Sequence, residues 1–180
     1  MTDKGVTHLV YTTEHPMFDN RQNRRLAFWQ QQNTVFQPEN RIEFHFLDEE
    51  GLNLEKDVVN KFLLTFVDKG VVAEIEREFN QNGELSLAFS DVGLVDVNAA
   101  GVNKGKGAKV LSELFGFSLE NTLALGDNYN DLEMLEVCGM PVVPQNGEES
   151  VKERARYVTA HNDDSPLTHA VRHLYPGLLD

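Results

Sequence analysis

Residues 123–135 read LALGDNYNDLEML, and this stretch decides the fold expected for the chain. The apolar run 123–125 predicts a short buried strand, and the residues from Asp131 onward predict a helix. Gly126 permits a tight turn between the two elements. Because parallel α/β sheets bind ligands at the carboxyl ends of their strands, Asp127 is expected at the mouth of a site.

The rest of the C-terminal half repeats this rhythm of strand and helix. Short connections separate the elements, which is typical of a parallel sheet covered by helices. Strands are predicted at 122–125, 141–143 and 157–160, and helices at 106–115, 131–137, 148–155 and 166–174.

The first ninety-odd residues have a different pattern, that of an α+β unit with a mostly antiparallel sheet. Strands are predicted at 8–13, 41–47, 85–89 and 93–98, helices at 24–32 and 54–69, and 71–79 fits either type. The chain is therefore expected to be an α/β protein of two domains, residues 1–98 and 99–180.

Composition narrows the class of function. Sixteen basic against 29 acidic residues give a net charge of −13, which disfavours nucleic acid as a partner. No apolar run is long enough to span a bilayer, so no membrane association is expected and the predicted location is the cytoplasm. Cys138 is the only cysteine, which excludes an internal disulfide and a cysteine-based zinc cluster.

Two acids and an amide follow the strand at 123–125 within one turn: Asp127, Asn130 and Asp131. Carboxylate and amide oxygens suit Mg²⁺, a hard cation that also bridges to substrate phosphates. The same residues would equally serve as turn and N-cap residues that satisfy backbone amides. Spacing leaves both interpretations open.

Residues 101–107 read GVNKGKG, a basic, glycine-rich turn that enters the helix predicted at 106–115. Exposed amides and Lys104 could hold a phosphate there, because helix N-termini attract anions. The spacing is not that of a Walker loop. A surface lysine on a flexible turn is the alternative.

Taken together, these two segments resemble the later motifs of the haloacid dehalogenase superfamily, most closely its Cof-type phosphatase branch. The resemblance covers residues 94–175. Residues 1–98 resemble, by pattern and position, the α+β cap of that branch, so the remainder would be the C-terminal part of a Rossmann-like core.

The resemblance implies a role for each matching residue. Asp127 would be a metal-binding acid, and Asp131 its acidic partner in metal binding and catalysis. Lys104 would neutralise the phosphate and the attacking carboxylate, and Asn130 would hydrogen-bond the phosphate. Asn162 and Asp163 fall in the family's last active-site loop, although Ser-Pro-Leu at 165–167 departs from its pattern. The implied activity is Mg²⁺-dependent hydrolysis of small phosphorylated metabolites such as sugar phosphates.

The family's first motif, an apolar strand followed by Asp-x-Asp-Gly-Thr, does not precede Lys104. The nearest match is FHFLDEEG at 44–51, but Asp48 falls inside the expected cap, so we interpret this stretch as a hairpin or a strand–helix turn with solvated acids. We therefore expect a truncated chain that begins inside or just before the cap and is inactive alone. Uncovered apolar surface would favour a homo-oligomer.

Two other functions fit parts of the pattern. A non-catalytic module that binds phosphorylated metabolites, or mediates an interaction, would keep the fold without the reaction. A receiver-like phosphoacceptor domain is disfavoured by the order of Lys104 and residues 128–131. In the expected cap, candidate substrate contacts are His15, Trp29, Arg41 and His45.

Overall fold

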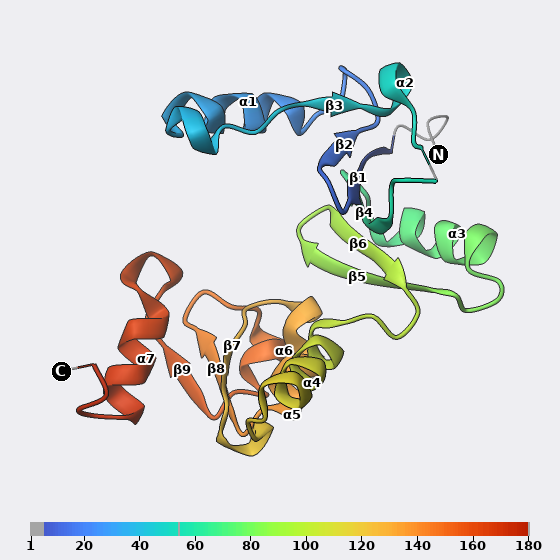
Figure 1. Cartoon of the computed structure of the whole chain (residues 1–180). Helices are drawn as coiled ribbons and strands as arrows, with labels where there is room; N and C mark the ends of the chain where they lie inside the picture. Colours follow the sequence, from blue (N-terminus) through green and yellow to red (C-terminus); the bar gives the residue numbers. More distant parts are fainter. Residues whose placement is uncertain (1–5, 54, 180) are drawn as a thin grey trace. The chain divides into compact units, whose positions relative to one another are not determined.

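The computed structural model describes residues 6–53 and 55–179 and divides into two compact units, Met1–Ala100 and Gly101–Asp180 (Figure 1). Both units combine helices with a β-sheet, which confirms the expected α/β class.

The first unit is built on a six-stranded sheet in the order β3-β2-β1-β4-β6-β5. All neighbouring strands are antiparallel except the pair β2 and β3. The strands are β1 (Thr7–Thr12), β2 (Pro16–Phe18), β3 (His45–Phe46), β4 (Val59–Thr65), β5 (Leu85–Asp91) and β6 (Leu94–Ala99). The helices are α1 (Leu26–Val35), α2 (Leu47–Glu50) and α3 (Lys69–Phe79), with a 3-10 turn at Pro38–Asn40.

The helix predicted at 54–69 is wrong, because this segment contains β4. Of the residues that suggested helical spacing, Leu63 and Val67 are buried, whereas Val58, Phe62 and Phe66 are 60%, 36% and 53% exposed. Leu63 and its neighbour Leu64 lie in different apolar clusters, as expected for a central strand with both faces covered. Leu54, the first residue of the predicted helix, lies outside the described residues.

Gly70, which directly follows the segment predicted to be helical, lies at the beginning of α3. Asp68 caps α3, since its side chain accepts the backbone N–H of Val71 at 2.9 Å. The segment 71–79, which fitted either type, is therefore helical.

The strand predicted at 41–47 is reduced to the two residues of β3. It pairs with the three-residue β2, so the pairing is short. Before β3, the backbone of Ile42 is hydrogen-bonded to the side chain of Asn33 and not to a neighbouring strand of the described part of the chain. Asn33 Oδ1 accepts the Ile42 N–H at 2.9 Å, and Nδ2 donates to the Ile42 carbonyl at 2.8 Å. A sequence pattern cannot distinguish a side-chain partner from a neighbouring strand.

Two apolar clusters hold the first unit together. One joins the sheet to α3 and is formed by Val6, Leu64, Val67, Ile75, Val95 and Val97. The other joins the sheet to α1 and is formed by Leu9, Phe18, Leu26, Phe46 and Leu63. Removal of this apolar surface from water is the main stabilising contribution.

The second unit is a parallel sheet in the order β7-β8-β9, as predicted. The strands are β7 (Leu123–Leu125), β8 (Met140–Pro144) and β9 (Tyr157–Thr159). The helices are α4 (Lys104–Phe115), α5 (Leu132–Val137), α6 (Glu149–Lys152) and α7 (Pro166–Leu174), with 3-10 turns at Leu119–Asn121, Tyr129–Asp131 and Asn162–Asp164. The helix predicted at 148–155 is thus shortened to α6.

One apolar cluster connects the sheet of the second unit with α5 and α6: Ala124, Leu135, Cys138, Val143 and Val151. Cys138 is buried there, and this burial raises the pKa of its thiol. Gly116 ends α4 in the left-handed conformation with φ of 69°, as expected for a glycine C-cap.

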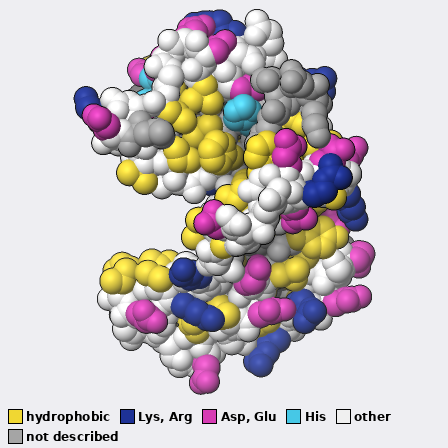
Figure 2. All heavy atoms as spheres, turned by 90° about the vertical axis from the view of Figure 1, so that its right-hand side faces the viewer, with side chains coloured by type: hydrophobic (Ala, Val, Ile, Leu, Met, Phe, Trp, Pro, Cys, Tyr) yellow, Lys and Arg dark blue, Asp and Glu magenta, His cyan; other side chains and the backbone are white. Residues whose placement is uncertain are grey.

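No helix within the described residues has the length and apolar composition needed to cross a bilayer. Acidic and basic side chains are interspersed with hydrophobic ones on the face drawn in Figure 2. Several large apolar side chains of α4 are exposed, among them Leu114 and Phe115 at 72% and 75%.

Candidate active site

The predicted site residues meet at the carboxyl end of β7. Asp127 follows β7 after Gly126, Asp131 ends the 3-10 turn Tyr129–Asp131, and Lys104 is the first residue of α4. Asn130 is half-buried within the same 3-10 turn.

Asp131 is the centre of this arrangement. It is only 3% exposed, and its Oδ1 accepts a hydrogen bond from the Lys104 ammonium. Its Oδ2 accepts the backbone N–H of Asp127 at 2.9 Å and that of Asn128 at 3.2 Å. A buried carboxylate needs such partners, because an unpaired charge is costly away from water. Asp131 thereby fixes the loop that carries Asp127.

The interpretation of these residues as turn and N-cap residues holds for Asp131, which accepts backbone amides of the preceding loop. The N-cap of the 3-10 turn itself is Asn128; its side chain accepts the Tyr129 N–H at 2.8 Å and forms a capping box with Asp131. Asp131 therefore takes part in the cap and also contacts Lys104.

Asp127 differs from Asp131 in its surroundings. The residue as a whole is exposed. Partial burial of its carboxyl group, followed by the negative charge of Asp131, raises its pKa, and the positive charge of Lys104 opposes that effect. A cation placed beside Asp127 would relieve this unfavourable charge.

Two glycines permit the close approaches that build the site. A Cβ on Gly126 would lie 2.4 Å from the Cβ of Asp131, and a Cβ on Gly105 would lie 2.6 Å from the carbonyl oxygen of Glu133. The first glycine lets Asp131 fold back on the loop, and the second lets α4 approach α5. Together they bring Lys104 to Asp131.

The sequence did not identify the loop after β8 as part of this edge. The Glu148 N–H donates to the carbonyl of Asp127 at 3.0 Å, and Asn146 Oδ1 accepts the Asn162 N–H at 2.9 Å. Asn146 thus links the loops that follow β8 and β9. The sequence could have indicated this role, because Asn146 comes just after a strand that lies beside β7, and parallel strands end at the same edge of a sheet.

Asp48 lies in the first unit, within α2, and it is exposed. It lies just after β3, where the strand passes into the helix, which is one of the two turn types predicted for this stretch.

Comparison with family models and curated proteins gives consistent matches. Residues 1–171 match the model described as haloacid dehalogenase-like hydrolase. The chain is 31% identical over 174 residues to 5-amino-6-(5-phospho-D-ribitylamino)uracil phosphatase YcsE of Bacillus subtilis (strain 168), covering 93% of this chain and 65% of that protein. A phosphoglycolate phosphatase of Methanosarcina acetivorans is 36% identical over 94 residues, and this match covers 47% of our chain and 42% of the phosphoglycolate phosphatase.

Solved structures share the fold. A haloacid dehalogenase-like hydrolase from B. subtilis aligns with a TM-score of 0.77 at 21% identity, over 96% of this chain and 67% of its own. A sugar phosphatase of subclass IIB of that superfamily aligns with a TM-score of 0.74 at 24% identity. The alignment covers 96% of our chain and 62% of the sugar phosphatase. The chain therefore spans about two thirds of the length of these relatives.

Proposed function

The chain belongs to the haloacid dehalogenase-like hydrolases. We propose that it contributes the metal and phosphate site of a Mg²⁺-dependent phosphatase, which acts on small phosphorylated metabolites such as sugar phosphates. The observation that carries the proposal is the ion pair of Lys104 with buried Asp131 beside Asp127, at the carboxyl end of a parallel strand. Relatives that are named as phosphatases of phosphorylated small molecules support the substrate class.

The donor set at Asp127 fits Mg²⁺. The residue is exposed, and partial burial of its carboxyl group, followed by the negative charge of Asp131, raises the pKa of that group. Mg²⁺ takes oxygen ligands and keeps several waters, so few protein ligands suffice. We propose Asp127 as the direct ligand. Asp131, also expected as a ligand, has both oxygens engaged by Lys104 and backbone amides, which favours a positioning role.

Lys104 is the proposed phosphate-binding group. Its side chain is 49% exposed although its ammonium is held by Asp131, so one face of the ammonium remains accessible to an anion. Asn130 would donate a hydrogen bond to the same phosphate. Mg²⁺, when bound, would supply further positive charge for the phosphate oxygens.

Binding of inorganic phosphate in the presence of Mg²⁺, measured by calorimetry, tests this proposal. Lys104→Ala should weaken phosphate binding, because it removes the cation that faces the site. Lys106→Ala is the matched control: this lysine lies two residues later in α4 and is exposed. Equal affinities in the two variants would overturn the assignment of Lys104.

The 180 residues contain no Asp-x-Asp-Gly-Thr, and this favours a second candidate function, a module that binds phosphorylated metabolites without turning them over. We propose that the chain tested alone does not hydrolyse p-nitrophenyl phosphate with Mg²⁺. Robust hydrolysis that Asp48→Asn abolishes would overturn that view. Titration of a sugar phosphate with and without Mg²⁺ would then separate a binding module from a catalytic one.

We further propose that the chain is cytoplasmic and self-associates through the exposed apolar side chains of α4. Leu114 and Phe115 are the most exposed of these. Burial of such side chains against a second copy would stabilise a homo-oligomer. Sedimentation at micromolar concentration tests this, with Leu114→Glu expected to shift the equilibrium to monomer. A monomeric wild-type profile would rule it out.

A further inference from the structure

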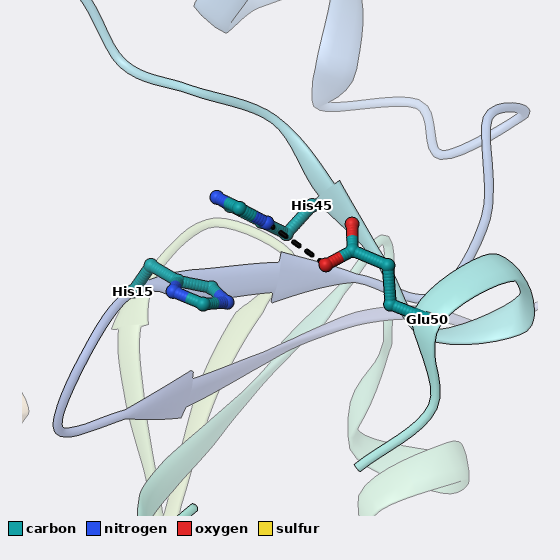
Figure 3. Close-up of side chains that lie close together, drawn as sticks. All are labelled: His15, His45 and Glu50. Atoms are coloured by element: carbon teal, nitrogen blue, oxygen red, sulfur yellow. Dashed lines mark hydrogen bonds and ion pairs between the residues drawn. The ribbon is translucent and has the colours of Figure 1, made fainter. Parts of the chain in front are cut away.

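Two histidines and a glutamate of the first unit lie close together, as Figure 3 shows. His15 lies in the turn between β1 and β2, His45 in β3, and Glu50 at the end of α2. One ligand atom of each lies within 4.8 Å of the other two. We propose that His15, His45 and Glu50 form a binding site for a divalent transition-metal ion such as Zn²⁺, separate from the phosphatase site.

The donor chemistry fits such an ion. Imidazole nitrogen and carboxylate oxygen are both zinc ligands, and sites with three protein ligands leave the fourth position to water. A tetrahedral ion at ~2.05 Å from its ligands places them about 3.4 Å apart. The ligand atoms, which lie within 4.8 Å of one another, must therefore move closer to bind one ion, and we propose that rotation of the side chains brings them together.

The three side chains lie close together, but imidazole binds a metal through a lone pair in the ring plane, so one of the two stacked rings must turn for both to bind the same ion. The rings of His15 and His45 stack with centroids 3.6 Å apart and an angle of 23° between their planes. His45 Nδ1 lies 3.0 Å from Glu50 Oε2. An ion would take the place of that hydrogen bond and bind both groups at once.

Hydrogen bonds from the backbone hold the cluster from both ends. The Thr12 hydroxyl accepts the His15 N–H at 3.1 Å and donates to the His15 carbonyl at 2.8 Å, which fixes the turn. Glu50 Oε1 accepts the Phe46 N–H at 3.1 Å, so Oε2 is left to face His45.

The site would have a structural role at the edge of the sheet. β3 has two residues and α2 has one turn, so few backbone hydrogen bonds hold this segment. A metal ion bound to His15, His45 and Glu50 would join it to the turn after β1. The imidazoles also make the site a poor one for Mg²⁺, which prefers oxygen ligands.

The test is a calorimetric titration of the 180-residue chain with Zn²⁺, combined with thermal unfolding. Saturable binding is expected, with a rise in the unfolding temperature because the ion binds only the folded state. His15→Ala, His45→Ala and Glu50→Gln should each weaken Zn²⁺ binding at least about tenfold, since loss even of an indirect partner costs that much.

Two controls locate the ion. Glu43 is the matched acid: its carboxylate lies 4.0 Å from His45 Nε2, outside the cluster, and its side chain is 91% exposed. Glu43→Gln should leave Zn²⁺ affinity unchanged, which separates ligation from attraction by negative charge. Asp127→Asn should also leave it unchanged, so that failure of the Mg²⁺ proposal and failure of this one are distinguishable.

Three results would overturn the site. One is the absence of saturable Zn²⁺ binding. Another is binding that survives both His15→Ala and His45→Ala, which would place the ion elsewhere. The third is an equal loss of affinity in Glu43→Gln and Glu50→Gln. Far-UV circular dichroism of each variant checks that it has folded.

Discussion

Lys104 and Asp131 form an ion pair between α4 and the turn after β7, although 27 positions separate them in the chain. The pair is asymmetric, because the Asp131 side chain is 5% exposed and that of Lys104 is 49% exposed. A buried acid is thus paired with a cation that still reaches solvent. Asp131 therefore has a structural role, and Lys104 is left able to bind an anion.

Asp131→Asn should lower the free energy of unfolding by about 1–3 kcal/mol, because the amide directs a donor group at Lys104 and loses a charge-assisted bond. Urea denaturation at neutral pH measures the change. Asp163→Asn is the matched control, since that side chain is 81% exposed and should change stability by less than about 0.5 kcal/mol. Equal effects in the two variants would contradict the role given to Asp131.

Gly126→Ala should lower the free energy of unfolding by about 1–3 kcal/mol, because the added Cβ would lie 2.4 Å from the Cβ of Asp131. Phosphate binding should weaken as well, since the loop carrying Asp127 must shift.

Gly107→Ala tests the same substitution where there is room. Gly107 lies within α4, and a Cβ there would meet nothing within 4 Å. This variant should gain about 0.5–1 kcal/mol, because alanine favours a helix interior over glycine. A loss of stability at Gly107, or none at Gly126, would contradict the packing argument. Thermal unfolding of both proteins provides the measurement.

The second unit could be predicted almost element by element because its signals are local. The helix predicted at 166–174 has the bounds of α7, and Gly116 ends α4 as expected. In the first unit, β4 was mistaken for a helix because its neighbours β1 and β6 are far away in the sequence. Tertiary pairing overrode a spacing that fitted a helix.

The sequence predicted which residues form the site, but it did not predict the contacts between them. It placed Asp127 and Asp131 within one turn and Lys104 at a helix start. It could not show that Lys104 contacts Asp131, since that depends on the close packing of α4 against α5 at Gly105. The contact between Asn146 and Asn162 also joins loops distant in the sequence.

Stability should fall in mild acid because of His8. Its side chain is 19% exposed, and its Nδ1 has no hydrogen-bond partner among the residues that the structure describes, although Asp19 Oδ2 lies 3.7 Å away. Burial lowers the pKa of His8, and the negative charge of Asp19 opposes this effect. The unfolded chain therefore binds the proton more readily, so stability is retained above roughly pH 6.5 and lost as pH falls below it.

His8→Gln removes this titration and isolates its contribution. The difference in unfolding free energy between wild type and His8→Gln should change as pH falls from about 7.5 to 5.5, in favour of the variant. Urea denaturation at several pH values measures it. A difference that stays constant over this range would contradict the buried, neutral state of His8.

Asp127→Asn should separate stability from metal binding. A raised folded-state pKa means that folding disfavours the ionised form of Asp127, so at neutral pH this carboxylate lowers stability. The amide removes the charge beside Asp131 and should raise the unfolding temperature slightly without Mg²⁺. The same variant should abolish the stabilisation that Mg²⁺ gives to wild type, since the direct ligand is lost.

Thermal unfolding with and without Mg²⁺ measures both effects of Asp127→Asn in one experiment. Asp48→Asn is the control, because Asp48 belongs to the competing acidic stretch at 44–51 and is exposed. It should keep the full stabilisation by Mg²⁺. If Asp48→Asn loses that stabilisation and Asp127→Asn keeps it, the metal lies in the first unit. The assignment of Asp127 would then be wrong, and the raised pKa of its carboxyl would reflect only its partial burial and the negative charge of Asp131.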